Sequence, residues 1–132
     1  MEDIFVARLM SSEVTTVEPD TLVEDAARTM LDNGIGSVVV VDGDGRLEGI
    51  LTTTDFVRIV AERQPKDQTP VSEYMTTGVR TAKAGDSITE AAETMLDVGI
   101  HHLPVVDDEN HVIGIITTTD LTAYVSQIEA HA

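Results

Sequence analysis

The sequence GILTTTD at residues 49–55 returns almost unchanged as GIITTTD at residues 114–120. In each copy the apolar start favours a strand, and the threonines followed by an aspartate are typical of a helix start. Working outward from this stretch, residues 6–60 superimpose on residues 71–125 at a constant offset of 65, with 22 of 55 positions identical. The chain is therefore one unit written twice.

Each copy predicts the elements β-α-β-β-α, opened by a short helical turn. In the first copy the turn is residues 6–10 and an extended piece follows at residues 14–17. The next helix has apolar residues at i, i+3, i+4, i+7 and i+8, then a glycine at its expected C-terminal cap. These residues are Val23, Ala26, Ala27, Met30, Leu31 and Gly34, matched by Ile88, Ala91, Ala92, Met95, Leu96 and Gly99.

Two strands and a helix complete each copy. In the first copy the strands are residues 38–41 and 47–51, joined by an Asp-Gly-Asp-Gly turn. The last helix is expected from Asp55, with Thr53 or Thr54 as its cap. The second copy repeats this pattern, with an extended piece at 79–82, strands at 103–106 and 112–116, and a helix from Asp120.

The repeats set the expected organisation. Residues 1–62 form motif 1, residues 63–70 form a polar linker with prolines, and residues 71–132 form motif 2. Units of this size rarely stand alone. The sequence therefore predicts an α+β fold in which two β-α-β-β-α repeats pack with pseudo-twofold symmetry, sheet against sheet with helices outside.

Composition limits the possible functions. The formal net charge is −16, with 24 acidic against 8 basic residues, so the surface repels nucleic acid and anionic membranes. No apolar run is long enough to span a bilayer, and the acidic start does not resemble a signal peptide. We expect a cytoplasmic protein, and the charge favours a high-salt habitat. The absence of cysteine excludes disulfides and thiolate metal sites.

No catalytic motif is present, so the chain is not expected to be an enzyme. No serine lies in a nucleophile elbow, and there is no phosphate loop or metalloprotease motif. The Asp-rich turn at residues 42–46 resembles a calcium loop only briefly, because Arg46 stands where a ligand is needed. No metal site is predicted.

The two copies together resemble the CBS domain family, named after cystathionine β-synthase. The segments that carry the resemblance are residues 14–19, 34–42, 49–55, 99–107 and 114–120. The resemblance implies a paired module with two clefts between the motifs. It implies an adenosine-containing ligand (AMP, ADP, ATP or S-adenosylmethionine), a homodimer, and a sensor that acts on an effector protein in trans.

The Gly-x-x-Thr-x-x-Asp segment suits such a ligand. Backbone N–H groups at a helix start favour a phosphate, Thr52 and Thr117 add hydroxyl donors, and Asp55 and Asp120 can accept both ribose hydroxyls. Further candidates are an apolar wall for the base and backbone groups that read the adenine edge; these are Val38, Leu103 and Pro104, then Thr16 and Thr81. Thr54 and Thr119 are candidate ligand contacts as well. The alternative is that these two threonines are helix caps and the two aspartates only favour a helix start.

Two adjacent histidines stand in the second copy. His101 and His102 occupy the places of Gly36 and Ser37 in the first copy, and all four are candidate ligand contacts. Neighbours on a strand point to opposite faces, so the two histidines do not chelate one metal. The resemblance implies that one of them faces the cleft of Asp55 while the other is partly packed.

Two further functions stay open beside the adenosyl sensor. One is an interaction module with empty clefts that dimerises through its helices. The other is a divalent-cation sensor that uses acidic residues such as Asp107, Asp108 and Glu109.

Overall fold

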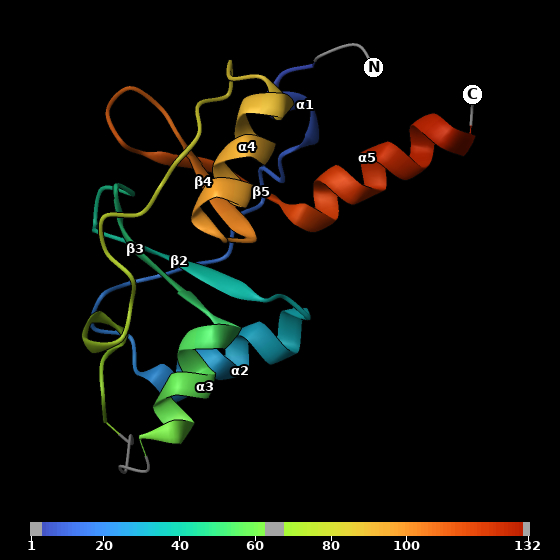
Figure 1. The fold of residues 1–132 in the computed structure, drawn as a ribbon. Coiled ribbons are helices and arrows are strands. Elements are labelled where there is room, and N and C mark those ends of the chain that lie inside the picture. Colours follow the sequence, from blue (N-terminus) through green and yellow to red (C-terminus); the bar gives the residue numbers. More distant parts are fainter. Residues whose placement is uncertain (1–3, 63–67, 131–132) are drawn as a thin grey trace. The chain divides into compact units, whose positions relative to one another are not determined.

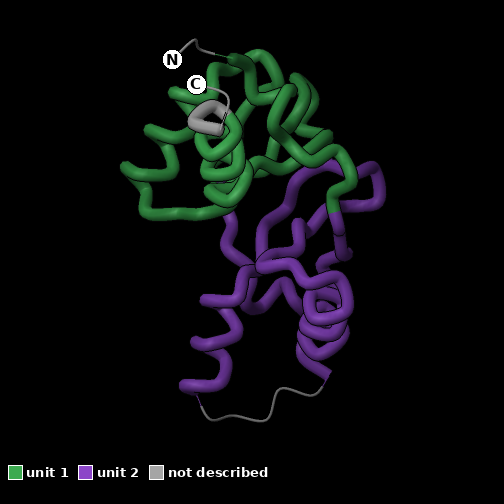
Figure 2. Tube along the Cα trace, turned by 90° about the vertical axis from the view of Figure 1, so that its right-hand side faces the viewer, with its two compact units in different colours: residues 1–14, 80–132 green, residues 15–79 purple. Residues whose placement is uncertain are grey.

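The computed structural model describes residues 4–62 and 68–130. It divides the chain into two compact units, coloured separately in Figure 2. Unit 2 is residues 15–79, and unit 1 joins residues 1–14 to residues 80–132. The fold is α+β, as the sequence predicts, with small sheets and helices in both units.

Unit 2 is built on a three-stranded sheet in the order β1-β2-β3; β2 and β3 are labelled in Figure 1. β1 (Thr16–Val17) runs parallel to β2 (Ser37–Val41), and β3 (Leu47–Thr52) pairs antiparallel with β2. Two helices, α2 (Val23–Asn33) and α3 (Thr53–Ala61), pack against β2 and β3. The predicted helix and strand order of the first copy is therefore confirmed.

Unit 1 has the corresponding elements around a two-stranded sheet. β4 (His102–Val106) pairs antiparallel with β5 (Val112–Thr117). α4 (Ile88–Val98) and α5 (Thr118–Ala130) contact each other and pack on the sheet, and α1 (Val6–Leu9) contacts α5 and β5. In both hairpins the register shifts near the end of the first strand, so even this irregularity is repeated.

Two short segments differ from the sequence prediction. The turn expected to open the second copy is a single 3-10 turn, η1 (Val71–Glu73). The extended piece expected at 79–82 pairs in parallel with β4 at a single bridge, between Ala82 and Val105, and is shorter than a regular strand. Residues 63–67 of the predicted linker lie outside the described residues.

Glycines end α2 and α4 as predicted. Gly34 follows α2 with φ 61° and Gly99 follows α4 with φ 75°, and both are left-handed conformations that glycine adopts without steric penalty. At the other end of α4 the Ser87 hydroxyl accepts the backbone N–H of Glu90 at 3.0 Å. Local sequence signals therefore fix the length of these helices.

The two cores are copies of each other. Unit 2 buries Val23, Ala26, Met30, Val38, Val40, Leu51 and Val71, and unit 1 buries the residues at the 65-residue offset: Ile88, Ala91, Met95, Leu103, Val105, Ile116 and Val6. The two valines of the opening segments are exchanged between the repeats. Val6 of the first copy lies in unit 1 and Val71 of the second copy lies in unit 2, both with no exposed surface. Each compact unit thus contains the opening segment of the other repeat.

Glycines in the repeated motif make room for these opening segments. A Cβ on Gly49 would lie 2.7 Å from the Thr76 carbonyl oxygen and 2.8 Å from the Met75 sulfur. A Cβ on Gly114 would lie 2.6 Å from the Met10 sulfur. Any side chain at these two positions would force its neighbours to shift. The glycine of each repeated heptapeptide is therefore the position against which the opening segment of the other repeat packs.

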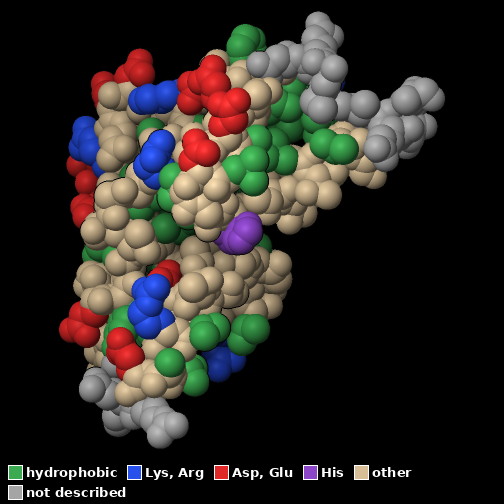
Figure 3. All heavy atoms as spheres, in the orientation of Figure 1, with side chains coloured by type: hydrophobic (Ala, Val, Ile, Leu, Met, Phe, Trp, Pro, Cys, Tyr) green, Lys and Arg blue, Asp and Glu red, His purple; other side chains and the backbone are tan. Residues whose placement is uncertain are grey.

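Acidic side chains lie at the surface of both units, interspersed with lysine and arginine on the face drawn in Figure 3. The described residues contain no helix that is long and apolar enough to cross a membrane.

Candidate functional site

The carboxylate of Asp55 is held in the first turn of α3, directly after β3. Its side chain is only 4% exposed. Its Oδ2 accepts the backbone N–H of Thr52 at 2.8 Å and the Thr52 hydroxyl at 3.3 Å. Its Oδ1 accepts Nη1 of Arg58 at 3.2 Å. A buried carboxylate needs such partners, and together they fix its orientation.

Asp120 repeats this arrangement at the start of α5. Its Oδ2 accepts the backbone N–H and the hydroxyl of Thr117 at 2.8 and 3.0 Å. The backbone N–H of Asp120 donates back to the Thr117 hydroxyl at 3.2 Å. This reciprocal pair is a capping box, with aspartate in place of the more common glutamate. Asp120 is half-buried, and Ala123 stands where the first copy has Arg58.

The threonines that cap these helices are not the predicted ones. Helices α3 and α5 begin one residue after Thr52 and Thr117, and it is these two threonines that bond the aspartates. Thr54 and Thr119 lie exposed in the first turn. The prediction of Thr53 or Thr54 as cap is wrong, and so is the choice of Thr54 and Thr119 in the alternative. The other half of that alternative, in which the two aspartates serve the helix start, agrees with these bonds. The aspartate at the third helical position selects the threonine three residues before it.

The start of the neighbouring strand lies against each helix start. The backbone N–H of Thr53 donates to the Gly36 carbonyl at 3.2 Å, and that of Thr118 donates to the His101 carbonyl at 3.0 Å. In the strand ladders Ser37 is opposite Thr52, and His102 is opposite Thr117. In each unit four of the predicted residues therefore come together at one strand–helix junction.

We name these places by their residues. The first junction comprises Gly36, Ser37, Thr52 and Asp55 of unit 2. The second junction comprises His101, His102, Thr117 and Asp120 of unit 1. At both, backbone dipoles of a helix start lie beside a fixed carboxylate and favour a polar ligand with hydroxyl donors and an anionic group.

The backbone of Thr16 and Thr81 is turned away from the sheet. The Thr15 carbonyl accepts the N–H of Val39, so the next residue, Thr16, turns its N–H and carbonyl to the open edge. Ala82 donates to Pro104 and accepts from Val106, so Thr81 before it also turns outward. A neighbouring N–H and carbonyl are the groups that an adenine edge requires.

The side chains of Val38 and Leu103 belong to the two cores. They are 0% and 1% exposed and pack with the buried residues of their own unit. The prediction that these two side chains form an apolar wall for a base is therefore wrong, and only their backbone remains for a ligand. Pro104 alternates with the core-facing residues of β4 and turns to the opposite face of the sheet, but its side chain is fully buried as well.

The two histidines have different surroundings. His101 is exposed and precedes β4, while His102 is half-buried at its first position. Burial lowers the pKa of His102 below its usual 6.5, and the neighbouring His101 lowers it further. His102 is therefore predominantly neutral at pH 7 and can donate or accept a hydrogen bond without adding positive charge.

In the acidic turn 107–109, hydrogen bonds within the protein already engage Asp107. Asp107 accepts the backbone N–H groups of His111 and Glu109, each at 2.9 Å, and the bond from the His111 backbone is the main cause that lowers the pKa of Asp107. Lys83 donates to the Asp107 carbonyl at 2.8 Å. Among residues 4–62 and 68–130, no three acidic or histidine side chains are placed to hold a metal ion. The cation-sensor alternative therefore gains no support here.

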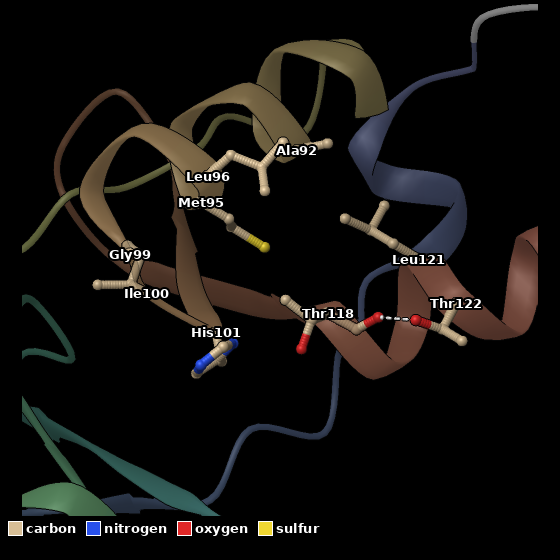
Figure 4. Close-up of a pocket in the computed structure, with 9 residues that line it drawn as sticks. All are labelled: Ala92, Met95, Leu96, Gly99, Ile100, His101, Thr118, Leu121 and Thr122. Atoms are coloured by element: carbon tan, nitrogen blue, oxygen red, sulfur yellow. Dashed lines mark hydrogen bonds between the residues drawn. The ribbon is translucent and has the colours of Figure 1, made fainter.

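A cavity of about 340 Å³ lies between α4 and α5 in unit 1 (Figure 4). The sequence alone does not predict it. The apolar spacing of the two helices includes Leu31 and Leu96, but these side chains are 81% and 82% exposed. The lining is mostly apolar and comprises Ala92, Met95, Leu96, Gly99, Ile100, His101, Thr118, Leu121 and Thr122.

Two copies of a strand–helix junction with a fixed carboxylate define a tandem α+β module. The CBS domain profile matches residues 6–62 and residues 71–127. The chain therefore belongs to the CBS domain family, and it carries the domain twice.

The relatives differ in how much of their own length the chain covers. The chain is 34% identical over 112 residues to a CBS domain-containing protein of Bacillus subtilis, YhcV, and the match covers 85% of this chain and 79% of the relative. It is 35% identical over 121 residues to a homoserine O-acetyltransferase of Methanosalsum zhilinae. That match covers 92% of this chain but only 24% of the enzyme. In such relatives the chain corresponds to a minor part of a longer protein.

Solved structures share the fold over nearly the whole chain. The CBS domain pair of protein MJ0100, in complex with 5′-methylthioadenosine and S-adenosyl-L-methionine, has a TM-score of 0.87 at 27% identity. The match covers 96% of this chain and 98% of that one. A putative signal-transduction protein with CBS domains from Burkholderia ambifaria has a TM-score of 0.84 at 33% identity, with coverages of 92% and 93%.

Proposed function

We propose that this chain is a regulatory module that binds an adenosine-containing ligand at its two strand–helix junctions and passes the signal to a partner protein. The observation that carries the proposal is the fixed carboxylate of Asp55 and Asp120, one at each junction. A carboxylate of this kind suits the two neighbouring hydroxyls of a ribose. The complex of the MJ0100 domain pair with two adenosyl compounds supports the ligand class.

The remaining parts of the ligand have suitable neighbours at each junction. The helix start offers backbone N–H groups and a positive dipole end for the 5′ substituent. The outward backbone of Thr16 and of Thr81 offers a donor and an acceptor for adenine. Adenosine, AMP, ADP, ATP, 5′-methylthioadenosine and S-adenosylmethionine share these elements and differ mainly in charge.

Calorimetric titration tests the proposal with 5′-methylthioadenosine, S-adenosylmethionine and AMP. We expect Asp55→Ala and Asp120→Ala each to weaken ligand binding at its own junction by tenfold or more, since hydrogen bonds to a charged group contribute about 1.5–3 kcal/mol each. If both variants bind like the parent, the ribose assignment is refuted.

Ser87→Ala is the matched control. Ser87 also caps a helix in unit 1, with its hydroxyl accepting from Glu90, but it lies at no junction. Loss of its cap costs about 1 kcal/mol of stability. Ligand binding should be unchanged in this variant, so that a loss in Asp120→Ala cannot be attributed to a weakened helix start.

Self-association is the second candidate function, and exposed apolar helix surface favours it. Leu31 on α2 and Val57 and Val60 on α3 are 81%, 69% and 76% exposed. On unit 1 Leu96 borders the cavity between α4 and α5. We propose that a second copy of the chain covers these surfaces. Sedimentation analysis should give a dimer for the parent and a monomer for Leu31→Glu with Leu96→Glu. A monomeric parent would refute the homodimer.

A further inference from the structure

The two junctions differ in one charged side chain. At the first junction Arg58 donates to Asp55 Oδ1 at 3.2 Å, and its own side chain is 59% exposed while that of Asp55 is 4% exposed. At the 65-residue offset the second junction has Ala123. The arginine lies three residues after the aspartate, on the same side of α3, so the helix itself holds the pair together.

The difference changes the local charge of the ligand site. At the first junction the aspartate and the arginine compensate each other. At the second junction the charge of Asp120 has no cation at the equivalent position, and His102 is predominantly neutral at pH 7. The helix starts, which also favour anions, occur at both junctions and do not distinguish them.

Arg58 also has donors left for a ligand. A guanidinium carries five N–H groups, and one nitrogen of Arg58 bonds Asp55. Because the group is more than half exposed, it is accessible to an anion without first being released from the protein. Planar guanidinium forks bind phosphate well.

We propose that Arg58 gives the two junctions different ligand preferences: the first takes an adenosyl ligand with a phosphate, and the second takes an uncharged or cationic one, such as a thioether or a sulfonium. The inference rests on the proposed function, because it assumes that the ribose lies at Asp55 and Asp120. The module would then sense two classes of metabolite, one at each junction, instead of the same class at both junctions.

Variants that silence one junction allow the other to be measured alone. Asp120→Asn leaves only the first junction active, and Asp55→Asn leaves only the second. The probes are AMP and 5′-methylthioadenosine, measured by calorimetry. In the Asp120→Asn background we expect Arg58→Ala to weaken AMP by about tenfold, equal to about 1.4 kcal/mol, and to change 5′-methylthioadenosine by less than twofold. Arg58→Lys should restore most of the AMP affinity.

The reverse change is made at the second junction. In the Asp55→Asn background, Ala123→Arg should strengthen AMP relative to S-adenosylmethionine by three- to tenfold. The change should shrink as salt is raised, because salt screens exposed charges. Thermal unfolding of each variant confirms that it is folded before titration.

The outcomes separate the inference from the function on which it rests. If the parent binds neither probe, or binds both independently of the two aspartates, the proposed function fails and the inference with it. If binding depends on the aspartates but Arg58→Ala changes both probes equally, the proposed function stands and the charge preference is overturned.

Discussion

Replacing Gly49 with alanine places a methyl group where the structure has no space. The new Cβ would lie 2.7 Å from the Thr76 carbonyl oxygen, closer than real contacts of this kind. That oxygen cannot move easily, because Ile50 and Thr76 exchange two backbone hydrogen bonds, of 3.1 and 2.9 Å. Either the two bonds or the strand must give way, and we expect a loss of about 2–3 kcal/mol of unfolding free energy.

Gly114→Ala is the informative comparison. Its Cβ would first meet the sulfur of Met10 at 2.6 Å, which is the flexible part of a long side chain, and the Ser11 carbonyl oxygen only at 3.0 Å. A methionine side chain can change rotamer, so we expect a smaller loss of about 1 kcal/mol. Gly43→Ala has open space and an ordinary φ, and should change stability by less than about 0.5 kcal/mol.

Urea unfolding followed by circular dichroism measures these differences, in a high-salt buffer that screens the net charge of −16. The order of stability should be Gly43→Ala, then Gly114→Ala, then Gly49→Ala. An unchanged midpoint for Gly49→Ala, or an equal loss for Gly49→Ala and Gly114→Ala, would show that the close approach of Thr76 does not limit the position.

Three further results are expected. Between pH 6.5 and the lowered pKa of His102 the unfolded chain binds the proton that the folded chain does not, so stability should fall as the pH falls through this range, and His102→Gln should flatten the unfolding curve there. Asp107 also has a lowered pKa, and its contribution is lost only as the pH falls below about 3.8, so Asp107→Asn should lower stability evenly across pH 5–7 and leave the slope of stability against pH there unchanged. Val6→Ala should cost about 2 kcal/mol by urea unfolding, because a fully buried side chain loses its contacts, whereas Ala7→Ser, at an exposed site beside it, should be near neutral.

Local signals in the sequence were sufficient for most of the fold. The apolar spacing of α2 and α4 and their terminal glycines depend only on neighbouring residues, and both helices end where predicted. The cap of α3 was placed wrongly because three threonines in a row each satisfy the rule for the residue type. Only the partner three residues later, Asp55, distinguishes Thr52 from Thr53 and Thr54.

The candidate site was predictable in its positions but not in its contacts. The junction residues come together because a hairpin places the start of one strand beside the end of the next, which the sequence order already implies. The ion pair of Arg58 with Asp55 could have been found from its i, i+3 spacing. The burial of Val38 and Leu103 in the cores depends on which face of each strand the helices cover, and the continuous apolar runs hide that choice.

The exchange of opening segments gives a physical reason for the duplication. Each unit completes its core with a valine from the other repeat, Val6 in unit 1 and Val71 in unit 2. A single copy would have to pack its opening segment on its own sheet. In both units of this chain, the opening segment instead packs on the sheet of the other repeat. Because Gly49 and Gly114 are needed to receive these segments, the repeated heptapeptide has two separate duties. Its glycine joins the repeats, and its threonine and aspartate form the junction that we propose binds the ligand.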